Sequence, residues 1–279
     1  MMSSFFASLR HRRRQLELMD APDLDAGPHT AALRALARIN RVTRANMLFW
    51  PAIRDLANQQ NPRPVRVLDI ASGGGDVARA LARKARRHGL ALQVAACDKS
   101  AIAIRHARHC DARGPASRVN YFQLDALRDP LPNDYDILTS SLFLHHLSTR
   151  DAVLLLRKMA AASRQLVLVS DLLRTRPGYA LAWLGPPILT RSPVVRTDAI
   201  LSVAAAFSRT EVRQLARDSG LGEARVTRHW PQRFVLQWRR TPASPGVNPQ
   251  CQVMSNPAER CPDTSRQSVA RIENKGLIG

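Results

Sequence analysis

The sequence predicts an α/β protein: a doubly wound, mostly parallel seven-stranded sheet with an antiparallel C-terminal edge strand and an N-terminal helical cap. Short apolar runs alternate with segments of helical periodicity, and a glycine-rich turn joins the first run to a helix. Near the end of the chain, two further runs are separated only by a short turn and indicate a hairpin. Such alternation builds right-handed βαβ units, which cover both faces of a parallel sheet with helices.

The first strand is predicted over residues 65–70, where Val67, Leu68 and Ile70 are typical of a buried parallel strand. It runs into three successive glycines at positions 73–75, and a helix is predicted over 75–88. Glycine permits a positive φ and a close approach of the backbone to a ligand. The helix N-terminus presents unpaired N–H groups to an anion. The segment therefore indicates a nucleotide-type site.

The remaining elements follow from periodicity and boundary signals. We expect residues 1–60 to form the helical extension, residues 61–240 the main domain, and residues 241–279 a disordered tail rich in Pro, Ser, Asn and Gln. A capping box at Ser208 and Glu211 opens a helix that closes at Gly220. Further strands are expected at 92–97, 119–124, 135–141, 166–171, 223–230 and 233–239, and further helices at 99–112, 148–162 and 209–219.

Residues 69–75 resemble motif I of the class I S-adenosylmethionine (SAM) dependent methyltransferases, Asp/Glu-x-Gly-x-Gly-x-Gly. The motif stands here as Asp69-Ile-Ala71-Ser-Gly73-Gly-Gly75. Ala71 replaces the first glycine, where we expect a small side chain to matter more than a positive φ. The resemblance covers about residues 30–240 and implies SAM as the cofactor. The turn also matches the dinucleotide pattern Gly-x-Gly-x-x-Gly/Ala, so an NAD(P)-dependent oxidoreductase remains an alternative.

Acidic residues follow three of the predicted strands, whose carboxyl ends meet at the edge of the sheet where ligands bind. Asp98 can accept hydrogen bonds from ribose hydroxyls, and the resemblance implies that Asp125 accepts from the adenine amine. Carboxylates suit the sulfonium and ammonium groups of SAM better than they suit a pyrophosphate. Its carboxylate can bind the amides of Gly73–Gly75. Each aspartate alone would equally suit a capping or turn role. The predicted cofactor site comprises Asp69, Ala71, Ser72, Gly73, Gly75, Asp98, Lys99, Asp125, Ala126 and Ser141.

Methyl transfer to a neutral hydroxyl also requires a proton acceptor. For a phenol, deprotonation at neutral pH costs roughly 4 kcal/mol, which a positioned histidine can offset. The predicted general base is His146, with His145 as the second candidate and His229 as the third. The alternative is that the histidine pair caps the helix near Ser148 or lines the pocket without transferring a proton.

Residues 172–207 form an apolar insert that we expect to be a substrate lid. Its composition suits a hydrophobic acceptor, either acidic or phenolic; packing on the core is the alternative. Four arginines flank it: Arg174, Arg176, Arg191 and Arg196. Three residues of the N-terminal helices are expected to close the other side: Met47, Phe49 and Trp50.

At a finer level the chain resembles the ubiquinone/menaquinone-biosynthesis type of methyltransferase. Glu17-Leu-Met-Asp20, followed by Leu36-Ala-Arg-Ile-Asn40-Arg41, is similar to a bacterial subgroup associated with polyketide and phenolic-lipid pathways. The resemblance implies O- or C-methylation of a small hydrophobic aromatic, phenolic or polyketide-type acceptor.

The formal net charge of +20 leaves other partners open. Of 42 basic residues only four are lysine, and the arginines spread along the whole chain without interleaved aromatics, which favours a compositional bias. An RNA methyltransferase is the alternative, but no Asn/Asp-Pro-Pro-Tyr-like motif follows the fourth strand. A non-catalytic protein that keeps the fold also remains open. The basic cluster Arg10–Arg14 is expected to begin a solvated helix, and contact with an anionic membrane is its alternative.

Four cysteines without CxxC spacing predict neither a zinc site nor a disulfide scaffold, and we expect no bound metal. Residues 178–190 are the most apolar stretch, but Pro186, Pro187 and Arg191 interrupt it before it reaches the length of a membrane span. The N-terminus has the reverse order of a signal peptide. These features predict a cytoplasmic protein.

Overall fold

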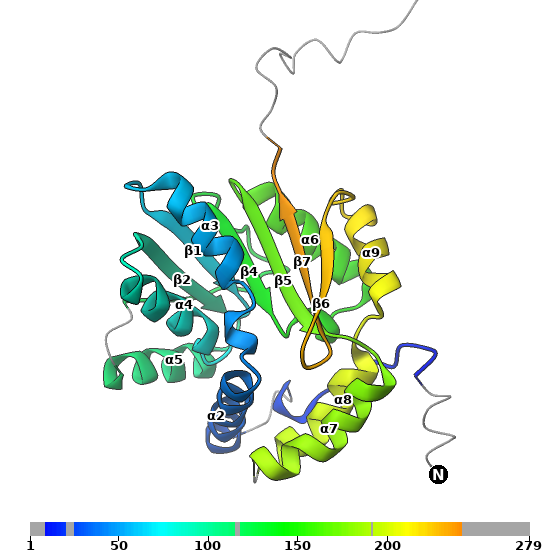
Figure 1. Ribbon diagram of the computed structural model, residues 1–279. Helices are drawn as coiled ribbons and strands as arrows, with labels where there is room; N and C mark the ends of the chain where they lie inside the picture. The colour runs from blue at the N-terminus through cyan, green and yellow to red at the C-terminus, as the bar shows by residue number, and fades with distance from the viewer. Residues whose placement is uncertain (1–8, 21–24, 115–117, 191, 242–279) are drawn as a thin grey trace, which may run out of the picture. The chain divides into compact units, whose positions relative to one another are not determined.

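The computed structural model describes residues 9–20, 25–114, 118–190 and 192–241. The predicted tail lies outside the described residues from position 242 onward. Seven strands form within the described part of the chain: β1 (Val65–Ile70), β2 (Leu92–Asp98), β3 (Asn120–Gln123), β4 (Ile137–Ser141), β5 (Leu166–Leu172), β6 (Arg225–His229) and β7 (Arg233–Arg239). They make one sheet in the order β3-β2-β1-β4-β5-β7-β6 (Figure 1). The predicted fold class is confirmed.

The first five strands are parallel to their neighbours, and β7 runs antiparallel to β5 and β6. The predicted C-terminal hairpin therefore forms, with its second strand placed between β5 and β6. Side chains alternate between the two faces of the sheet, as the period of two requires. Val67 and Leu168 point to one apolar cluster, whereas Leu68 and Val169 point to another.

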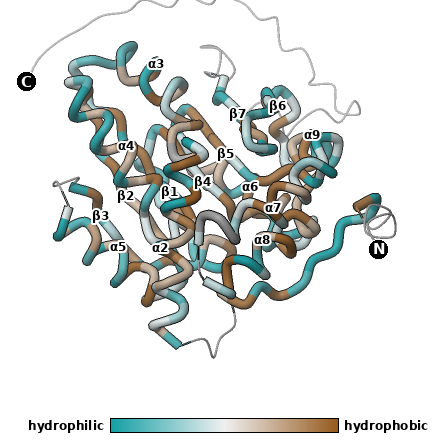
Figure 2. Tube along the Cα trace, turned by 60° about the horizontal axis from the view of Figure 1, so that its bottom comes forward, coloured by the Kyte–Doolittle hydropathy of each residue, from teal (hydrophilic) through white to brown (hydrophobic). Residues whose placement is uncertain are grey.

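Helices cover both faces of the sheet. The face with Val67 packs against α3 (Trp50–Gln60) and α4 (Asp76–Arg87), and α5 (Ala101–Arg113) extends this layer over β2 and β3. The opposite face packs against α6 (Thr149–Ala162) and α9 (Arg209–Asp218). Hydrophobic colouring runs along β5 and hydrophilic colouring along much of α3 (Figure 2). The predicted capping box of α9 is present at Ser208 and Glu211.

Three further helices lie beyond the carboxyl ends of the parallel strands and pack on one another: α2 (Ala26–Val42), α7 (Arg176–Leu189) and α8 (Pro193–Ala205). The insert predicted as a lid thus consists of α7 and α8. Short 3₁₀ segments η1 (Leu18–Asp20), η2 (Ala45–Met47) and η3 (Leu144–His146) complete the described elements. None of the helices in the described ranges has the length and apolar character needed to cross a membrane.

Residues 9–17, named here the N-terminal strap, have no regular secondary structure, so the predicted helix start at Arg10–Arg14 is wrong. Arg12 explains why the segment is extended. Its guanidinium donates to the carbonyl oxygens of His145 (2.8 Å) and Leu147 (2.7 Å) and stacks over the Phe207 ring. The strap is therefore fastened across η3 by side-chain hydrogen bonds.

Ala71 has a φ of +52°, which corrects the expectation that this position needs only a small side chain. The chain turns through a left-handed conformation immediately after β1, and an L residue there is strained by about 1–2 kcal/mol. Glycine would relieve that strain, which is the physical reason for glycine in the motif.

Gly75 is required by packing as well as by its φ of +70°. A Cβ atom there would lie 2.7 Å from Tyr121 Cε1 on β3 and 3.2 Å from Ala107 Cβ on α5. The third glycine of the motif therefore allows α4, α5 and β3 to approach one another.

We expect Gly75→Ala to destabilise the protein by about 2–4 kcal/mol, because left-handed strain and overpacking add. Gly89→Ala is the matched control: Gly89 has a φ of +65°, and nothing lies within 4 Å of its Cβ position. This control should cost only about 1 kcal/mol. Urea denaturation measures both values, and equal losses would show that crowding at Tyr121 is unimportant.

Candidate active site

A cavity of about 640 Å³ opens at the carboxyl ends of the parallel strands. One side is formed by residues 71–74 of the glycine loop (residues 71–75) and the ends of β2 and β4, and the other by α2, α7, α8 and the N-terminal strap. The volume lies within the range of about 300–1,000 Å³ that is typical of small-molecule sites. The far wall is apolar and includes Leu33, Leu36, Ile39, Leu181, Val195 and Val203.

Most of the predicted cofactor residues meet on the side of the cavity formed by the glycine loop and the strand ends. Ala71, Ser72, Gly73, Asp98, Lys99, Asp125, Ala126 and Ser141 all line the cavity. The Ser72 hydroxyl is buried and has no hydrogen-bond partner among the described residues, as expected of a group that meets a ligand. Asp69 and Gly75 lie outside the lining and support the loop from behind.

Asp69 is 1% exposed, and its Oδ1 accepts a hydrogen bond from Thr139 Oγ1 (2.7 Å), while its Oδ2 has no hydrogen-bond partner within the described ranges. Burial raises the pKa of Asp69 to about 7 even though the Thr139 bond lowers it, and the charges of Asp76 and Asp98 raise it further. The carboxyl is thus partly neutral near neutral pH. Its position behind the loop gives no support to direct contact with a sulfonium or ammonium group.

The glycine-loop amides are already engaged. Asp98 Oδ2 accepts from the Gly73 amide (2.8 Å), and the Gly75 amide donates to the Ser72 carbonyl (2.9 Å). Of the three amides expected to bind a cofactor carboxylate, those of Gly73 and Gly75 are thus engaged within the protein, and Gly74 lines the cavity. Asp98 ties the end of β2 to the loop of β1, and its Oδ1 accepts from the Ser100 amide. It remains on the cavity wall, where it can face ribose hydroxyls.

Asp125 combines the two roles that its sequence position suggests. Its Oδ1 accepts from the Leu127 amide (3.0 Å), which makes it a turn-capping residue. Its side chain is 33% exposed, and the residue lines the cavity beside Ala126. The turn fixes the carboxylate at the adenine end of the predicted site.

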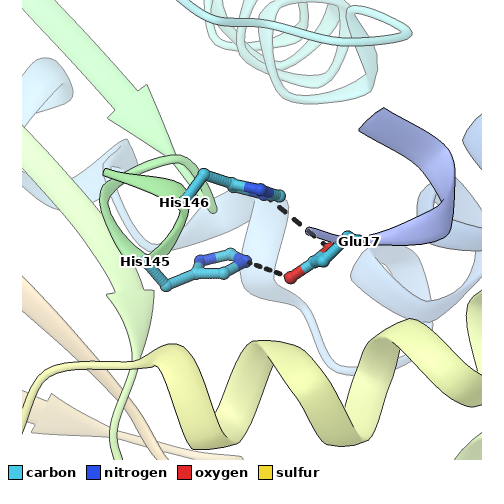
Figure 3. A group of neighbouring side chains, drawn as sticks. All are labelled: Glu17, His145 and His146. Atoms are coloured by element: carbon cyan, nitrogen blue, oxygen red, sulfur yellow. Dashed lines mark ion pairs between the residues drawn. The ribbon is translucent and has the colours of Figure 1, made fainter. Parts of the chain in front are cut away.

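Glu17, His145 and His146 form a cluster on the cavity wall (Figure 3). His145 Nε2 lies 3.4 Å from Glu17 Oε1, and His146 Nε2 lies 3.9 Å from Glu17 Oε2. The N-terminal strap brings Glu17 to the histidines of η3. The Ser202 hydroxyl on α8 donates to Glu17 Oε1, the oxygen that faces His145, at 2.6 Å.

Asp171 at the end of β5 holds His145 from the other side. Its Oδ1 lies 2.7 Å from His145 Nδ1, and its Oδ2 accepts from the His145 amide (2.9 Å). Burial by itself lowers the pKa of His145, but the two carboxylates outweigh it and raise this pKa to about 10. Pairing with His145 correspondingly outweighs burial and lowers the pKa values of Glu17 and Asp171. His145 is thus a buried imidazolium between two carboxylates near neutral pH.

The two histidines therefore differ in what they can do. A protonated His145 cannot accept a proton from an acceptor molecule, and it serves instead to hold Glu17 ionised and in place. His146 has a side chain that is 19% exposed and lines the cavity. It can contact an acceptor while facing Glu17. His229 lies outside the lining and contacts Thr227 Oγ1 (2.8 Å), so its position gives no support to a role as base.

The ligand atoms of Glu17, His145 and His146 lie within 4.8 Å of one another, and in the described part of the chain this is the group that could hold a metal ion. Two histidines and a carboxylate are a donor set that suits divalent transition metals. In this protein, however, the negative charges of Glu17 and Asp171 are already compensated by the protonated His145 between them. A metal ion would have to displace that proton.

Several residues of the wall are additional to the predicted set: Glu17, Asn40, Asp76 and Arg233 line the cavity, and Asp171 lies directly behind it. Signals for some of them are present in the sequence. Asp76 follows the glycine loop directly, and Asp171 ends a predicted strand as Asp98 does. Arg233 starts β7, and because β7 runs antiparallel to β5, its first residue lies beside the carboxyl end of β5 at the ligand edge.

The substrate side differs from expectation in two respects. Met47, Phe49 and Trp50 are absent from the lining; Phe49 and Trp50 are buried against the sheet, and α2 closes the cavity instead. Of the flanking arginines, Arg191 lies outside the described residues, and the other three do not line the cavity. Arg174 pairs with Glu211 at 2.8 Å. The three described arginines that flank the insert therefore do not form part of the cavity wall.

Comparison with known proteins agrees with this geometry. Residues 67–165 match the family model described as a methyltransferase domain. No curated protein sequence matches the chain.

Solved structures share the fold. A protein from Nostoc punctiforme PCC 73102 assigned as an O-methyltransferase superposes with a TM-score of 0.54 at 20% identity, covering 86% of this chain and 67% of that chain. A SAM-dependent methyltransferase from Aquifex aeolicus superposes with a TM-score of 0.53 at 18% identity, and the match covers 78% of this chain and 99% of that chain. An O-methyltransferase family 2 protein from Planctomyces limnophilus DSM 3776, in complex with apigenin, superposes with a TM-score of 0.50 at 17% identity. The match covers 80% of this chain and 64% of that chain.

The sheet order and the glycine loop are those of the class I SAM-dependent methyltransferase fold, and residues 67–165 match a methyltransferase domain. The cofactor of this domain is S-adenosyl-L-methionine, which supplies a methyl group on a sulfonium when bound. The residues present fit it: a carboxylate at the end of β2, another just after β3, and a buried Ser72 hydroxyl that no described residue binds.

The charge on His145 predicts a specific pH dependence of stability. Its pKa is about 6.5 in an unfolded chain and about 10 in the folded protein. The stabilisation is thus fully present below pH 6.5 and is lost as the pH rises toward 10. We expect the wild type to be more stable than His145→Gln at about pH 6, with the difference shrinking toward about pH 9.5. Urea denaturation gives this difference, and one that grows with pH would contradict the assignment of charge.

Asp98→Ala should weaken the binding of SAM and S-adenosylhomocysteine by at least about 100-fold, because hydrogen bonds to the carboxylate are lost and the glycine loop is released. Asp134→Ala is the matched control, since Asp134 pairs with Arg66 and does not line the cavity. Calorimetric titration of both variants measures the effect. Unchanged affinity in Asp98→Ala would remove this residue from the cofactor site.

Proposed function

We propose that this protein methylates a small, hydrophobic aromatic or polyketide-type acceptor, at a hydroxyl oxygen or at a ring carbon activated by that hydroxyl. The observation that supports this most directly is the pairing of His146 and Glu17 with an apolar wall across the same cavity. An apolar wall binds the body of such a molecule, and the polar pair meets its hydroxyl. The resemblance to the ubiquinone/menaquinone-biosynthesis type implies the same acceptor class.

The charges on the cavity wall favour a neutral acceptor over an acidic one. Carboxylates outnumber cations among the lining residues, and Arg174, one of the flanking arginines, pairs with Glu211 away from the lining. An acceptor that carried its own carboxylate would meet Glu17 on the strap and Asp198 on α8. The Planctomyces protein named above was solved with apigenin, a neutral polyphenol, which supports the choice of a phenolic acceptor.

The residues suggest a simple division of labour. His145 remains protonated and holds Glu17 as a carboxylate beside His146. His146 accepts the hydroxyl proton of the acceptor, and Glu17 stabilises the imidazolium that forms. The resulting phenolate is the nucleophile, either at oxygen or at an adjacent ring carbon. The two walls hold it in line with the transferred methyl group, and such alignment can contribute about 7–11 kcal/mol.

The acceptor class is tested by incubating the protein with methyl-labelled SAM and three acceptors: an alkyl-substituted phenol, the same phenol with a ring carboxylate, and bulk RNA. We expect label in the neutral phenol at a rate at least about ten times that in its carboxylated analogue, because the cavity wall is acidic. Transfer to RNA alone would overturn the proposal and favour a nucleic-acid substrate.

His146→Ala should lower kcat by about 10²–10⁴-fold, the usual contribution of a general base, while leaving the affinity for S-adenosylhomocysteine unchanged. His229→Ala serves as the matched histidine control, because His229 lies outside the cavity lining. Turnover and calorimetric binding are measured on both variants. If His146→Ala keeps wild-type turnover, another group accepts the proton.

A further inference from the structure

Arg233 at the start of β7 is a buried cation with unused hydrogen-bonding capacity. It is 3% exposed, and its Nη2 donates to Asn40 Oδ1 at 2.9 Å. Its Nε and Nη1 atoms have no hydrogen-bond partner in the described part of the chain. Leaving donors of a charged group unpaired in the interior is costly, so they are expected to meet a ligand. Arg233 lines the cavity, where such a ligand would bind.

Asn40 extends this arrangement into a row of three side chains. Its Oδ1 accepts from Arg233, and its Nδ2 donates to Asp76 Oδ2 at 3.2 Å. The three residues come from β7, α2 and α4, and all of them line the cavity. The row therefore has a cation at one end and a carboxylate at the other, held apart by the neutral amide of Asn40.

The position of the row is next to the glycine loop, because Asp76 is the first residue of α4 and follows Gly75. The loop amides of Gly73 and Gly75 are already engaged, so a carboxylate bound at this end of the cavity has few loop donors and needs others beside them. Lys99 also lines the cavity, but it directly follows β2 and is exposed. Arg233 thus supplies buried, charged donors beside the loop.

We propose that the Asp76–Asn40–Arg233 row binds the α-amino-acid group of SAM, with Arg233 binding its carboxylate and Asp76 its ammonium. The inference rests on the cofactor of the methyltransferase domain. A zwitterion matches a row with both charges, and the arginine can form strong charge-assisted hydrogen bonds with a carboxylate. A simple anion fits less well, because Asp76 and Asp171 are both close enough to Arg233 to influence its charge.

The experiment compares three ligands that share the adenosyl sulfur group, by calorimetric titration of the full chain. S-adenosylhomocysteine carries both charges, its decarboxylated amine carries only the ammonium, and 5′-methylthioadenosine carries neither. For Arg233→Met we expect affinity for S-adenosylhomocysteine to fall by about 30-fold, equivalent to about 2 kcal/mol, with the other two ligands unchanged. For Asp76→Asn we expect S-adenosylhomocysteine and the amine to weaken, with 5′-methylthioadenosine unchanged.

Two further variants guard against an effect on folding. Arg233→Lys keeps the charge but loses the planar array of donors, and it should fall between the wild type and Arg233→Met. Arg239→Met is the matched control, because Arg239 is exposed at the opposite end of the same strand. Thermal denaturation of each variant confirms that the titrated protein is folded.

Three results would overturn the proposal. Equal weakening of all three ligands in Arg233→Met would mean that the row only supports the fold of the cavity. Unchanged binding of S-adenosylhomocysteine, together with a raised KM for a carboxylated acceptor, would assign Arg233 to the acceptor. Absence of binding of every adenosyl ligand to the wild type would reject the cofactor itself, which separates that failure from a failure of the row.

Discussion

The buried carboxylate of Asp171 is the point on which the arrangement of the site depends. It ends β5 and fixes both the backbone and the ring of His145, and through His145 it fixes Glu17 of the N-terminal strap. Removing one partner from such a network leaves an uncompensated charge in the interior, which typically costs 3–5 kcal/mol. The network therefore makes the sheet edge, η3 and the strap a single rigid unit.

The same carboxylate links the two halves of the cavity. Asp171 influences the charge of Arg233, which in turn reaches Asn40 and Asp76 beside the glycine loop. Acceptor-side and cofactor-side groups thus belong to one continuous electrostatic system. A charge that arrives on one side changes the field on the other, because interactions in a buried site are screened far less than in water.

The sequence predicts the elements well where the signal is local. The apolar run around Leu68, the glycines that follow and the capping box at Ser208 each depend on neighbouring residues, and the structure has these elements. Residues that act through distant partners escape such patterns. Asp69 belongs to the motif but faces the interior, because a strand has two faces and the pattern does not distinguish them. Gly75 also lies outside the cavity lining, at the start of α4. Arg233 acquires its role only when β7 enters the sheet beside β5.

The extended strap shows the same limit from another direction. Its several arginines are typical of a solvated basic segment. Arg12, however, donates hydrogen bonds to carbonyl groups at η3, which are remote in sequence. Propensity and charge pattern contain no information about those acceptors. The open carbonyls exist because η3 is too short to satisfy them internally.

The strap also has a consequence for the order in which the domain assembles. Glu17 is near the beginning of the chain, but its partner Ser202 is 185 residues further along. During synthesis the first residues must wait for nearly the whole domain before their contacts exist, and such distant contacts form late because loop closure opposes them. The sheet can therefore be complete while one wall of the cavity is still absent. We therefore expect the strap contacts, which have a greater sequence separation than the strand pairings, to form late in folding.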